Sequence, residues 1–324
     1  MSVVKLPQSK AMRDTLLLAI HQEMLRDSEI FFVTADFGSP ILDKIRADRP
    51  DRFINVGIAE QNLINVTAGL ALEGYKVFAY AIAPFITMRC YEQIRINLAL
   101  LSVVRAMNVN LIGVGAGYSY VVSGPTHQCF EDIIVMRALP NMSIYSPSDQ
   151  VMAAALTDHC LKTIGPKYLR LDAEALPVLY TEAPRNFNDG FNILRKGNRI
   201  CLIATGYMVH VALEVADKLS ASGISVSVVD LFCLSDFSED KMNSVLSSCK
   251  GVVTLEEGFR GRGGVDALIF DYILRSNIKI QTLNIGVKGE YCFDLGSRDI
   301  LHEKAGIGPD SVMHSVEKFN HTLV

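Results

Sequence analysis

A single carboxylate, Glu60, stands where a short apolar strand is expected to pass into a helix. The β-prone residues 53–56 precede it, and apolar residues at helical spacing follow from Leu63 to Ala71. A buried carboxylate would need a hydrogen-bonding partner or a proton, because burial disfavours its charged form. The alternative is an exposed acid in the first turn of a helix, where the helix dipole favours it. The local residues alone favour this second interpretation.

A histidine lies in the loop Gly124-Pro125-Thr126-His127-Gln128. Gly and Pro favour a tight turn that can aim an imidazole into a cleft, where it can transfer protons near neutral pH. The alternative is a loop histidine that bonds a backbone carbonyl.

An aromatic residue and two arginines lie in the segment from Phe85 to Arg95. At a spacing of four, Arg89 and Gln93 would share one face of a helix, whereas Arg95 would point elsewhere. Arg89 is therefore the candidate for a cation that faces a site, with a solvated or salt-bridged arginine as the alternative. Phe85, taken alone, would be an ordinary core residue.

Two polar residues, Asp36 and Ser39, follow the strand expected to end at Thr34. The carboxyl ends of parallel strands are where α/β sheets bind ligands. Ser39 could bind a substrate phosphate, or it could cap a helix that begins at Pro40.

Buried strands that alternate with helices are expected to position these residues. Apolar runs typical of such strands occur at 30–34, 76–80, 109–114, 142–145, 167–171, 200–204, 224–229, 252–256 and 278–283. Helical patterns cover 9–26, 209–222 and 264–274. The alternation predicts an α/β protein of two domains, each a mostly parallel sheet covered by helices.

A polar, proline-containing stretch separates the two series of strands. We therefore predict a first domain over residues 1–180, a linker over 181–198, and a smaller second domain over 199–324.

The composition restricts the compartment and the partners. The chain has 324 residues, 49% of them hydrophobic, and a formal net charge of −4, which argues against nucleic acid or an anionic membrane surface as a partner. Its seven cysteines form no Cys-x-x-Cys pair, which favours reduced thiols over a zinc site. Neither a secretion signal nor an apolar run of membrane-spanning length is evident. We expect a cytoplasmic protein.

Several strings, in order along nearly the whole chain, resemble the transketolases. The motifs that carry the resemblance are Gly57-Ile58-Ala59-Glu60-Gln61-Asn62, Ala68-Gly69-Leu70-Ala71, the segment from Phe85 to Arg95, Gly124-Pro125-Thr126-His127-Gln128, Met136-Arg137-Ala138-Leu139-Pro140-Asn141, Ile203-Ala204-Thr205-Gly206 and Thr254-Leu255-Glu256-Glu257-Gly258. Together they resemble a pyrimidine-binding domain followed by a transketolase C-terminal domain. In extent, the chain is similar to the C-terminal subunit of a split transketolase.

The resemblance implies thiamine diphosphate as cofactor. It assigns to Glu60 the hydrogen bond to the N1′ atom of the aminopyrimidine, to Phe85 the stacking on that ring, and to His127 proton transfer around the substrate oxygens. The remaining residues implied at the cofactor are Gly57, Ile58 and Arg89.

One part of the family pattern is missing. The family binds a divalent cation, Mg²⁺ or Ca²⁺, through a Gly-Asp-Gly segment and a downstream Asn, and this chain has no Gly-Asp-Gly. Asn188-Asp189-Gly190 is a poor substitute because it follows no expected strand. We therefore expect no metal ligands here and a separate N-terminal subunit that holds the cation, in an α2β2 assembly.

The sequence also departs from the family in the sugar site. Ser123 replaces an Asp that contacts a sugar hydroxyl, Ala173 replaces an Arg that binds the sugar phosphate, and a phosphate-contacting His aligns with Gly115. These changes remove charge-assisted hydrogen bonds, each worth roughly 1.5–3 kcal/mol. They favour a ketol transfer in a specialised pathway, on an unphosphorylated or nucleotide-linked sugar.

Four residues are expected at the substrate: His127, Ser123, Ser39 and Tyr118. Tyr118 lies beside Tyr120 in a segment that could stack on or bond to an unusual group. The alternative is that a phosphate is held instead by Arg170, by Arg137 or by the partner subunit.

Two other functions remain open from the sequence. One is the β subunit of a thiamine-dependent 2-oxo acid dehydrogenase, which shares the two-domain layout and also has a Glu-Glu-Gly string. The loop at His127 and the string around Glu60 resemble the transketolases more. The other is a non-catalytic scaffold subunit, which would need no chemistry from Glu60.

Overall fold

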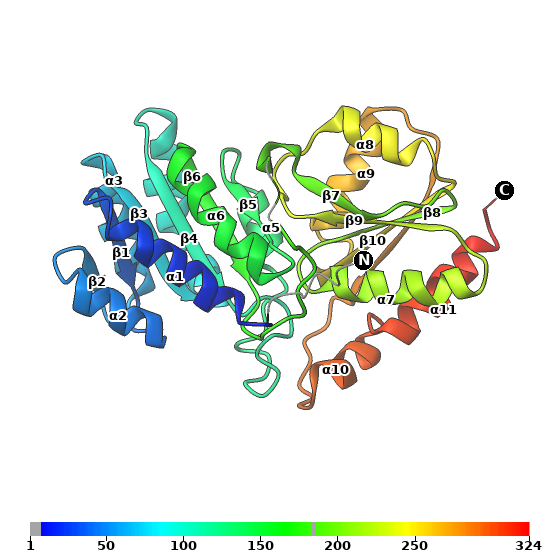
Figure 1. The fold of residues 1–324 in the computed structure, drawn as a ribbon, viewed down its shortest axis with the longest axis horizontal. Coiled ribbons are helices and arrows are strands. Elements are labelled where there is room, and N and C mark those ends of the chain that lie inside the picture. Colours follow the sequence, from blue (N-terminus) through cyan, green and yellow to red (C-terminus); the bar gives the residue numbers. More distant parts are fainter. Residues whose placement is uncertain (1–7, 183, 185, 324) are drawn as a thin grey trace, which may run out of the picture. The chain divides into compact units, whose positions relative to one another are not determined.

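The computed structural model describes residues 8–182, 184 and 186–323. They form two compact units (Figure 1): one extends from the amino-terminal side to Ala116 and adds Ala138–Arg185, and the other joins Gly117–Arg137 to the chain from Asn186 onward. The segment Gly117–Arg137, which the sequence placed in the first domain, thus groups with the second unit.

The first unit is built on a six-stranded parallel sheet in the order β2-β1-β3-β4-β6-β5. Its strands are β1 (Ile30–Thr34), β2 (Phe53–Asn55), β3 (Lys76–Ile82), β4 (Asn108–Val114), β5 (Ser143–Tyr145) and β6 (Gly165–Leu171). Every residue of β1 and β4 is buried, because helices cover both faces of the sheet. The sequence of β1 is a nearly continuous apolar run, whereas β4 also buries the polar side chains of Asn108 and Asn110.

Helices of the first unit cover the two faces of this sheet. They are α1 (Met12–Met24), α2 (Pro40–Asp48), α3 (Glu60–Leu72), the π-helical η1 (Phe85–Arg89), α4 (Tyr91–Gln93), the π-helical η2 (Ile94–Leu100), the 3-10 turn η3 (Leu101–Val103) and α6 (Gln150–Lys162). Helix α2 connects β1 to β2, and α3 connects β2 back across β1 to β3, in the opposite direction along the sheet. Right-handed crossovers therefore put α2 and α3 on opposite faces of the sheet. Helix α1 packs on α2 and α6, and α3 packs on η1 and η2.

The second unit has a five-stranded sheet in the order β11-β10-β8-β9-β7. Its strands are β7 (Phe191–Arg195), β8 (Ile200–Ala204), β9 (Val226–Leu231), β10 (Gly251–Phe259) and β11 (Gln281–Val287). Its helices are α5 (Asp132–Arg137), the 3-10 turn η4 (Phe187–Asp189), α7 (Met208–Ala221), α8 (Glu239–Leu246), α9 (Val265–Arg275), α10 (Arg298–Ala305) and α11 (Pro309–Asn320). Helices α7 and α11 pack together on one side of this sheet, and α8 and α9 lie on the other (Figure 1). The prediction of two helix-covered, mostly parallel sheets is confirmed.

Two elements differ from the expected pattern. Residues 191–195, inside the expected linker, form β7, the edge strand that pairs antiparallel with β9. The buried rings of Phe187 and Phe191 pack this polar stretch onto the second unit. The prolines and amides of the stretch had favoured a linker over a strand. Strand β11 begins three residues later than predicted, at Gln281.

Across the part of the chain that the structure describes, no helix is long and apolar enough to span a membrane.

Candidate active site

Glu60 is the first residue of α3, immediately after the turn that follows β2. The side chain of Asn55 accepts a hydrogen bond from the Gly57 amide at 2.9 Å, and Gly57 has a φ of 75°, a left-handed value that glycine adopts without strain. This turn carries Glu60 inward, and the residue is 3% exposed. The exposed-acid interpretation is therefore excluded, and Glu60 is a buried carboxylate at the carboxyl edge of the sheet.

Arg89 is the direct partner of this carboxylate. Its Nη1 donates to both Glu60 carboxylate oxygens, at 3.0 and 2.9 Å. The same guanidinium lies over the ring of Phe85, with its Cζ 4.1 Å from the ring centroid. Phe85 and Arg89 are the first and last residues of η1, which follows β3. Glu60 follows β2, so all three groups come from segments that directly follow two strands of the sheet.

The two arginines of this segment point in different directions. Arg89 turns toward α3, where Gln61 Nε2 also donates to the Arg89 backbone carbonyl at 3.4 Å. Arg95 instead pairs with Glu92 at the surface, at 3.0 Å. Burial and the neighbouring charge of Glu60 raise the pKa of Cys90 to about 12, so this thiol stays protonated beside the site.

The residues around Glu60 expose apolar surface. Ile58 is 77% exposed, and Met88, on η1, is also exposed. Both lie close in sequence to a site residue, since Ile58 precedes Glu60 by two positions and Met88 directly precedes Arg89.

Ser39 caps α2. Its Oγ accepts a hydrogen bond from the Ile41 amide and donates to Asp14 Oδ1, both at 3.3 Å. Of the two interpretations of Ser39, the structure thus provides the helix cap. A contact between Ser39 and substrate stays a prediction.

The histidine loop belongs to the second unit. The amides of His127 and Gln128 bond the Gly124 carbonyl, at 3.0 and 3.2 Å, and Gly124 has a φ of 69°. His127 is half-buried, and its Nδ1 lies 3.0 Å from Thr126 Oγ1. Ser123, next to this turn, is exposed. The tight turn thus holds a half-buried imidazole next to an exposed hydroxyl, and their contacts with substrate stay a prediction.

Gln128 is a residue that the motif contained but the sequence reasoning did not single out. It is 3% exposed, and within the described residues neither its amide oxygen nor its amide nitrogen has a hydrogen-bond partner. Buried amides are nearly always bonded, so an unsatisfied one beside His127 is a candidate ligand contact. Only the tertiary structure reveals this burial.

Tyr118 has a different environment from the one expected. It is 1% exposed, and its ring packs edge-on against Phe130 and His302, with centroids 4.6 and 5.6 Å apart. Burial raises the pKa of the Tyr118 hydroxyl above its usual value. The ring is a core residue of the second unit, and a contact with substrate stays a prediction.

The two glutamates of the Glu-Glu-Gly string have structural partners. Glu256 Oε1 accepts a hydrogen bond from the Asp266 amide in the first turn of α9 at 3.1 Å. Glu257 binds Arg298 Nη2 and His302 Nε2, each at 2.5 Å, and all three side chains are buried. Sequence reasoning missed this network because α10, which carries Arg298 and His302, lies about forty residues downstream of Glu257.

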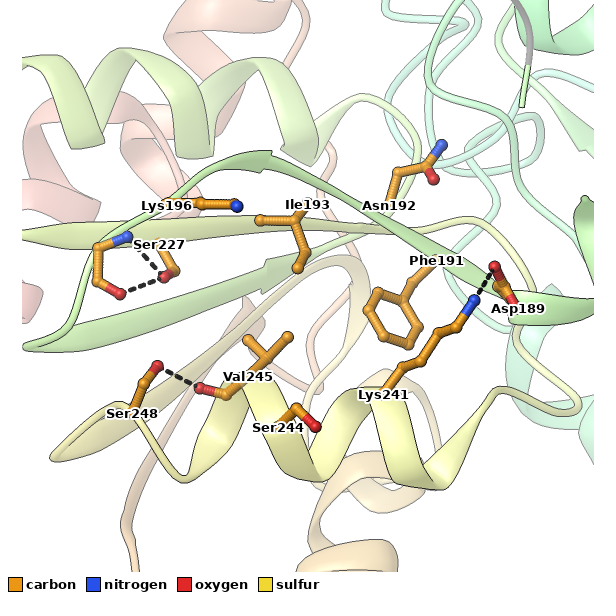
Figure 2. A pocket seen from close by; sticks show the side chains of 11 residues that line it. Asp189, Phe191, Asn192, Ile193, Lys196, Ser227, Lys241, Ser244, Val245 and Ser248 are labelled. Atoms are coloured by element: carbon orange, nitrogen blue, oxygen red, sulfur yellow. Dashed lines mark hydrogen bonds and ion pairs between the residues drawn. The ribbon is translucent and has the colours of Figure 1, made fainter. Parts of the chain in front are cut away.

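A cavity of about 500 Å³ lies between β7, β9 and α8 in the second unit (Figure 2). Its walls include Phe191, Val245 and the Lys241–Asp189 ion pair, in which Nζ and Oδ2 are 2.5 Å apart. None of the predicted site residues lines it. The size of the cavity therefore does not identify it as the place of the chemistry.

Cys249, the residue after Ser248 in the wall of this cavity, should react faster with thiol reagents than the other cysteines. Hydrogen bonding from the Cys201 thiol lowers the pKa of Cys249 to about 6, and Cys249 is partly accessible. Because the thiolate is the nucleophile, the rate of iodoacetamide labelling of Cys249 should increase with pH, with a midpoint at about pH 6. The rate should be close to its maximum by about pH 7. Mass spectrometry after a short pulse measures this, with Cys249→Ser as control. A midpoint above pH 8 would contradict it.

Two sequence models of known domains match this chain. The transketolase pyrimidine-binding domain matches residues 8–178, more than half of the chain, and the transketolase C-terminal domain matches residues 189–312. The chain belongs to the transketolase family. This membership favours a transketolase over the 2-oxo acid dehydrogenase alternative.

Its relatives in this family include separate subunits. One of them, a subunit of the apulose-4-phosphate transketolase of Actinobacillus succinogenes, is 33% identical over 265 residues, 82% of this chain and 83% of that protein. A 6-deoxy-6-sulfo-D-fructose transketolase subunit of a Clostridium species is 29% identical over 316 residues, 95% of this chain and 94% of that protein. A solved split-gene transketolase, an inactive β4 tetramer, has a TM-score of 0.83 and 29% identity, and covers 96% of this chain and 98% of its own.

Transketolases are transferase-type enzymes that depend on thiamine diphosphate, and the residues of the first unit fit one half of that cofactor. A buried carboxylate beside an aromatic face already binds a planar, nitrogen-rich cation, the Arg89 guanidinium. Within residues 8–323, apart from 183 and 185, no cluster of three His, Cys, Asp or Glu side chains could hold a metal ion.

Proposed function

We propose that this chain is the pyrimidine-binding subunit of a two-subunit transketolase that transfers a two-carbon ketol unit between sugars. The observation that carries the proposal is the buried Glu60 carboxylate beside Phe85, at the carboxyl edge of a parallel sheet. A scaffold would have no need for a carboxylate at the position of Glu60, since burying such a group costs free energy.

Each residue has a distinct task in this proposal. Thiamine diphosphate supplies an acidic thiazolium carbon and a ring that stabilises a carbanion. Glu60 would hold the hydrogen bond at the N1′ nitrogen of the aminopyrimidine, and Phe85 would orient that ring by stacking. His127, which its loop positions, would exchange protons with the substrate oxygens, while Gln128 and Ser123 would bond sugar hydroxyls.

A partner N-terminal subunit would hold the diphosphate and its Mg²⁺ or Ca²⁺, because this chain lacks Gly-Asp-Gly. The exposed Ile58 and Met88 beside Glu60 support such a subunit, which would cover them. The solved β4 tetramer is described as inactive, which fits a subunit that needs another. We propose an α2β2 assembly. All seven cysteines are free thiols, which supports a cytoplasmic location.

Calorimetry of cofactor binding tests whether the partner subunit supplies the contacts to the diphosphate and the cation. The isolated chain should bind thiamine diphosphate with Mg²⁺ at least a hundredfold more weakly than its mixture with the N-terminal subunit, because the diphosphate and cation contacts come from the partner. Free Mg²⁺ without cofactor is the control. Tight binding to the isolated chain would contradict the proposal.

The substrate is proposed to be an atypical sugar. Ser123 and Ala173 replace a carboxylate and a cation of the family's sugar site. Neither alternative arginine offers an obvious replacement: Arg137 Nη1 donates to the backbone carbonyls of Gly263 and Gly264, and Arg170 is buried in β6. The two relatives are named for a phosphorylated and a sulfonated sugar, which supports an atypical sugar as substrate.

A comparison of substrates tests this part. The reconstituted pair should turn over xylulose 5-phosphate with ribose 5-phosphate roughly a hundredfold less efficiently in kcat/KM than an ordinary transketolase, since two charge-assisted hydrogen bonds are lost. Restoring them with Ser123→Asp and Ala173→Arg should recover part of the difference. Equal kcat/KM for the unmodified pair would contradict the proposed substrate class.

A further inference from the structure

Arg89 occupies the space between the two groups assigned to the aminopyrimidine. Its Nη1 lies 3.0 and 2.9 Å from the Glu60 carboxylate oxygens, and its Cζ is 4.1 Å from the Phe85 ring centroid. One guanidinium thus satisfies the carboxylate and stacks on the aromatic face at the same time.

A guanidinium and an aminopyrimidine share the features that this position selects. Both are flat, both present nitrogen atoms that hydrogen bond to a carboxylic group, and both stack on an aromatic ring. The same carboxylate and the same ring face cannot serve both. Occupation by Arg89 and occupation by the cofactor ring are therefore alternatives.

We propose that Arg89 is a placeholder: in the subunit without cofactor it closes the aminopyrimidine position between Glu60 and Phe85, and it must swing out before the cofactor binds. This inference rests on the proposed function. It changes the role expected for Arg89, from a contact that supports the cofactor to a group that competes with it.

The surroundings of Arg89 allow this exchange. Its side chain is 46% exposed while that of Glu60 is 4% exposed, so the guanidinium can leave into water without opening the core. The long side chain needs only rotamer changes to do so. Without a partner, the Glu60 carboxylate would be buried alone, so the pair with Arg89 is favoured as long as no other group bonds Glu60.

The test compares Arg89→Met with Arg95→Met in the reconstituted pair. Met keeps an unbranched stem similar to the aliphatic part of the Arg side chain but cannot bond Glu60. Arg95 is the matched control, because it lies in the same segment and pairs at the surface with Glu92. Calorimetry with thiamine diphosphate and Mg²⁺ measures Kd, a readout independent of turnover.

Removal of a competing state raises the fraction of competent sites, so Arg89→Met should bind the cofactor about tenfold more tightly if the open form is about one tenth of the population. Arg95→Met should match the unmodified pair. An unchanged or weaker affinity of Arg89→Met, or an equal gain in Arg95→Met, would overturn the inference.

Two further measurements keep the outcome clear. If Arg89→Met does not fold, Arg89→Lys replaces it: an ammonium can reach Glu60 but lacks the flat stacking group, so its affinity should rise by a smaller factor, and no rise would overturn the inference. If the unmodified pair binds no thiamine diphosphate at all, the proposed function fails, whereas binding without a gain in the Arg89 variants rejects the placeholder alone.

Discussion

Replacing Glu60 by glutamine should lower kcat of the reconstituted enzyme by about 10²–10⁴-fold. Glutamine keeps the size of the side chain and can still bond Arg89, so the fold at the start of α3 should persist. It cannot, however, exchange a proton at the N1′ nitrogen of the cofactor ring. The loss should therefore appear in kcat, with cofactor affinity changed much less. Steady-state turnover and calorimetric cofactor binding, measured on the same preparation, separate the two effects.

Glu73→Gln is the matched control for this variant. Glu73 is an exposed carboxylate at the other end of the same helix. Its substitution should leave kcat within about twofold, as for surface changes in general. If Glu60→Gln kept more than a tenth of the unmodified kcat, the non-catalytic scaffold would become the better interpretation.

The second large effect concerns the stability of the second unit. Arg298→Met would leave Glu257 buried without its guanidinium partner, and removal of one member of a buried ion pair costs about 3–5 kcal/mol of unfolding free energy. Thermal and urea unfolding, followed by a probe in the second unit, measure the change. Lys304→Met on the same helix is the control, because Lys304 pairs with Asp294 at the surface, where such pairs contribute about 0–1 kcal/mol.

The stability conferred by Glu257 should also depend on pH. Burial raises the pKa of Glu257, but the charges and hydrogen bonds of Arg298 and His302 outweigh it and hold that pKa well below its ordinary value. The contribution is therefore complete above about pH 4.3, the value of an unfolded glutamate, and is lost as pH falls below it. The Arg298→Met variant should lose most of this acid dependence. Unchanged stability of Arg298→Met at pH 7 would contradict the account. So would a double variant, Glu257→Gln/Arg298→Met, that is no more stable than Arg298→Met.

Much of the fold follows from local sequence properties. Strand β1 is covered on both faces, and its sequence from Ile30 to Thr34 is accordingly a nearly continuous apolar run. Strand β7 could not be found this way. It is a short edge strand in a polar stretch, and its register depends on β9, more than thirty residues away.

The candidate site was predictable in identity but not in arrangement. The motif around Glu60 and the aromatic residue Phe85 singled out the two central groups. Helical spacing indicated that Arg89 faces a site, but it did not show that Arg89 bonds Glu60, because that contact joins η1 to the start of α3. The burial of Gln128 and the Glu257 network likewise result from tertiary contacts between distant segments.

The most direct test of the account is reconstitution of ketol transfer. This chain and an N-terminal transketolase subunit that carries Gly-Asp-Gly would each be assayed alone and mixed, with thiamine diphosphate, Mg²⁺ and a panel of ketose donors. The account predicts no turnover by either subunit and turnover by the mixture, lost when the mixture contains Glu60→Gln. Turnover by this chain alone, or a mixture that binds the cofactor and is indifferent to Glu60, would contradict it.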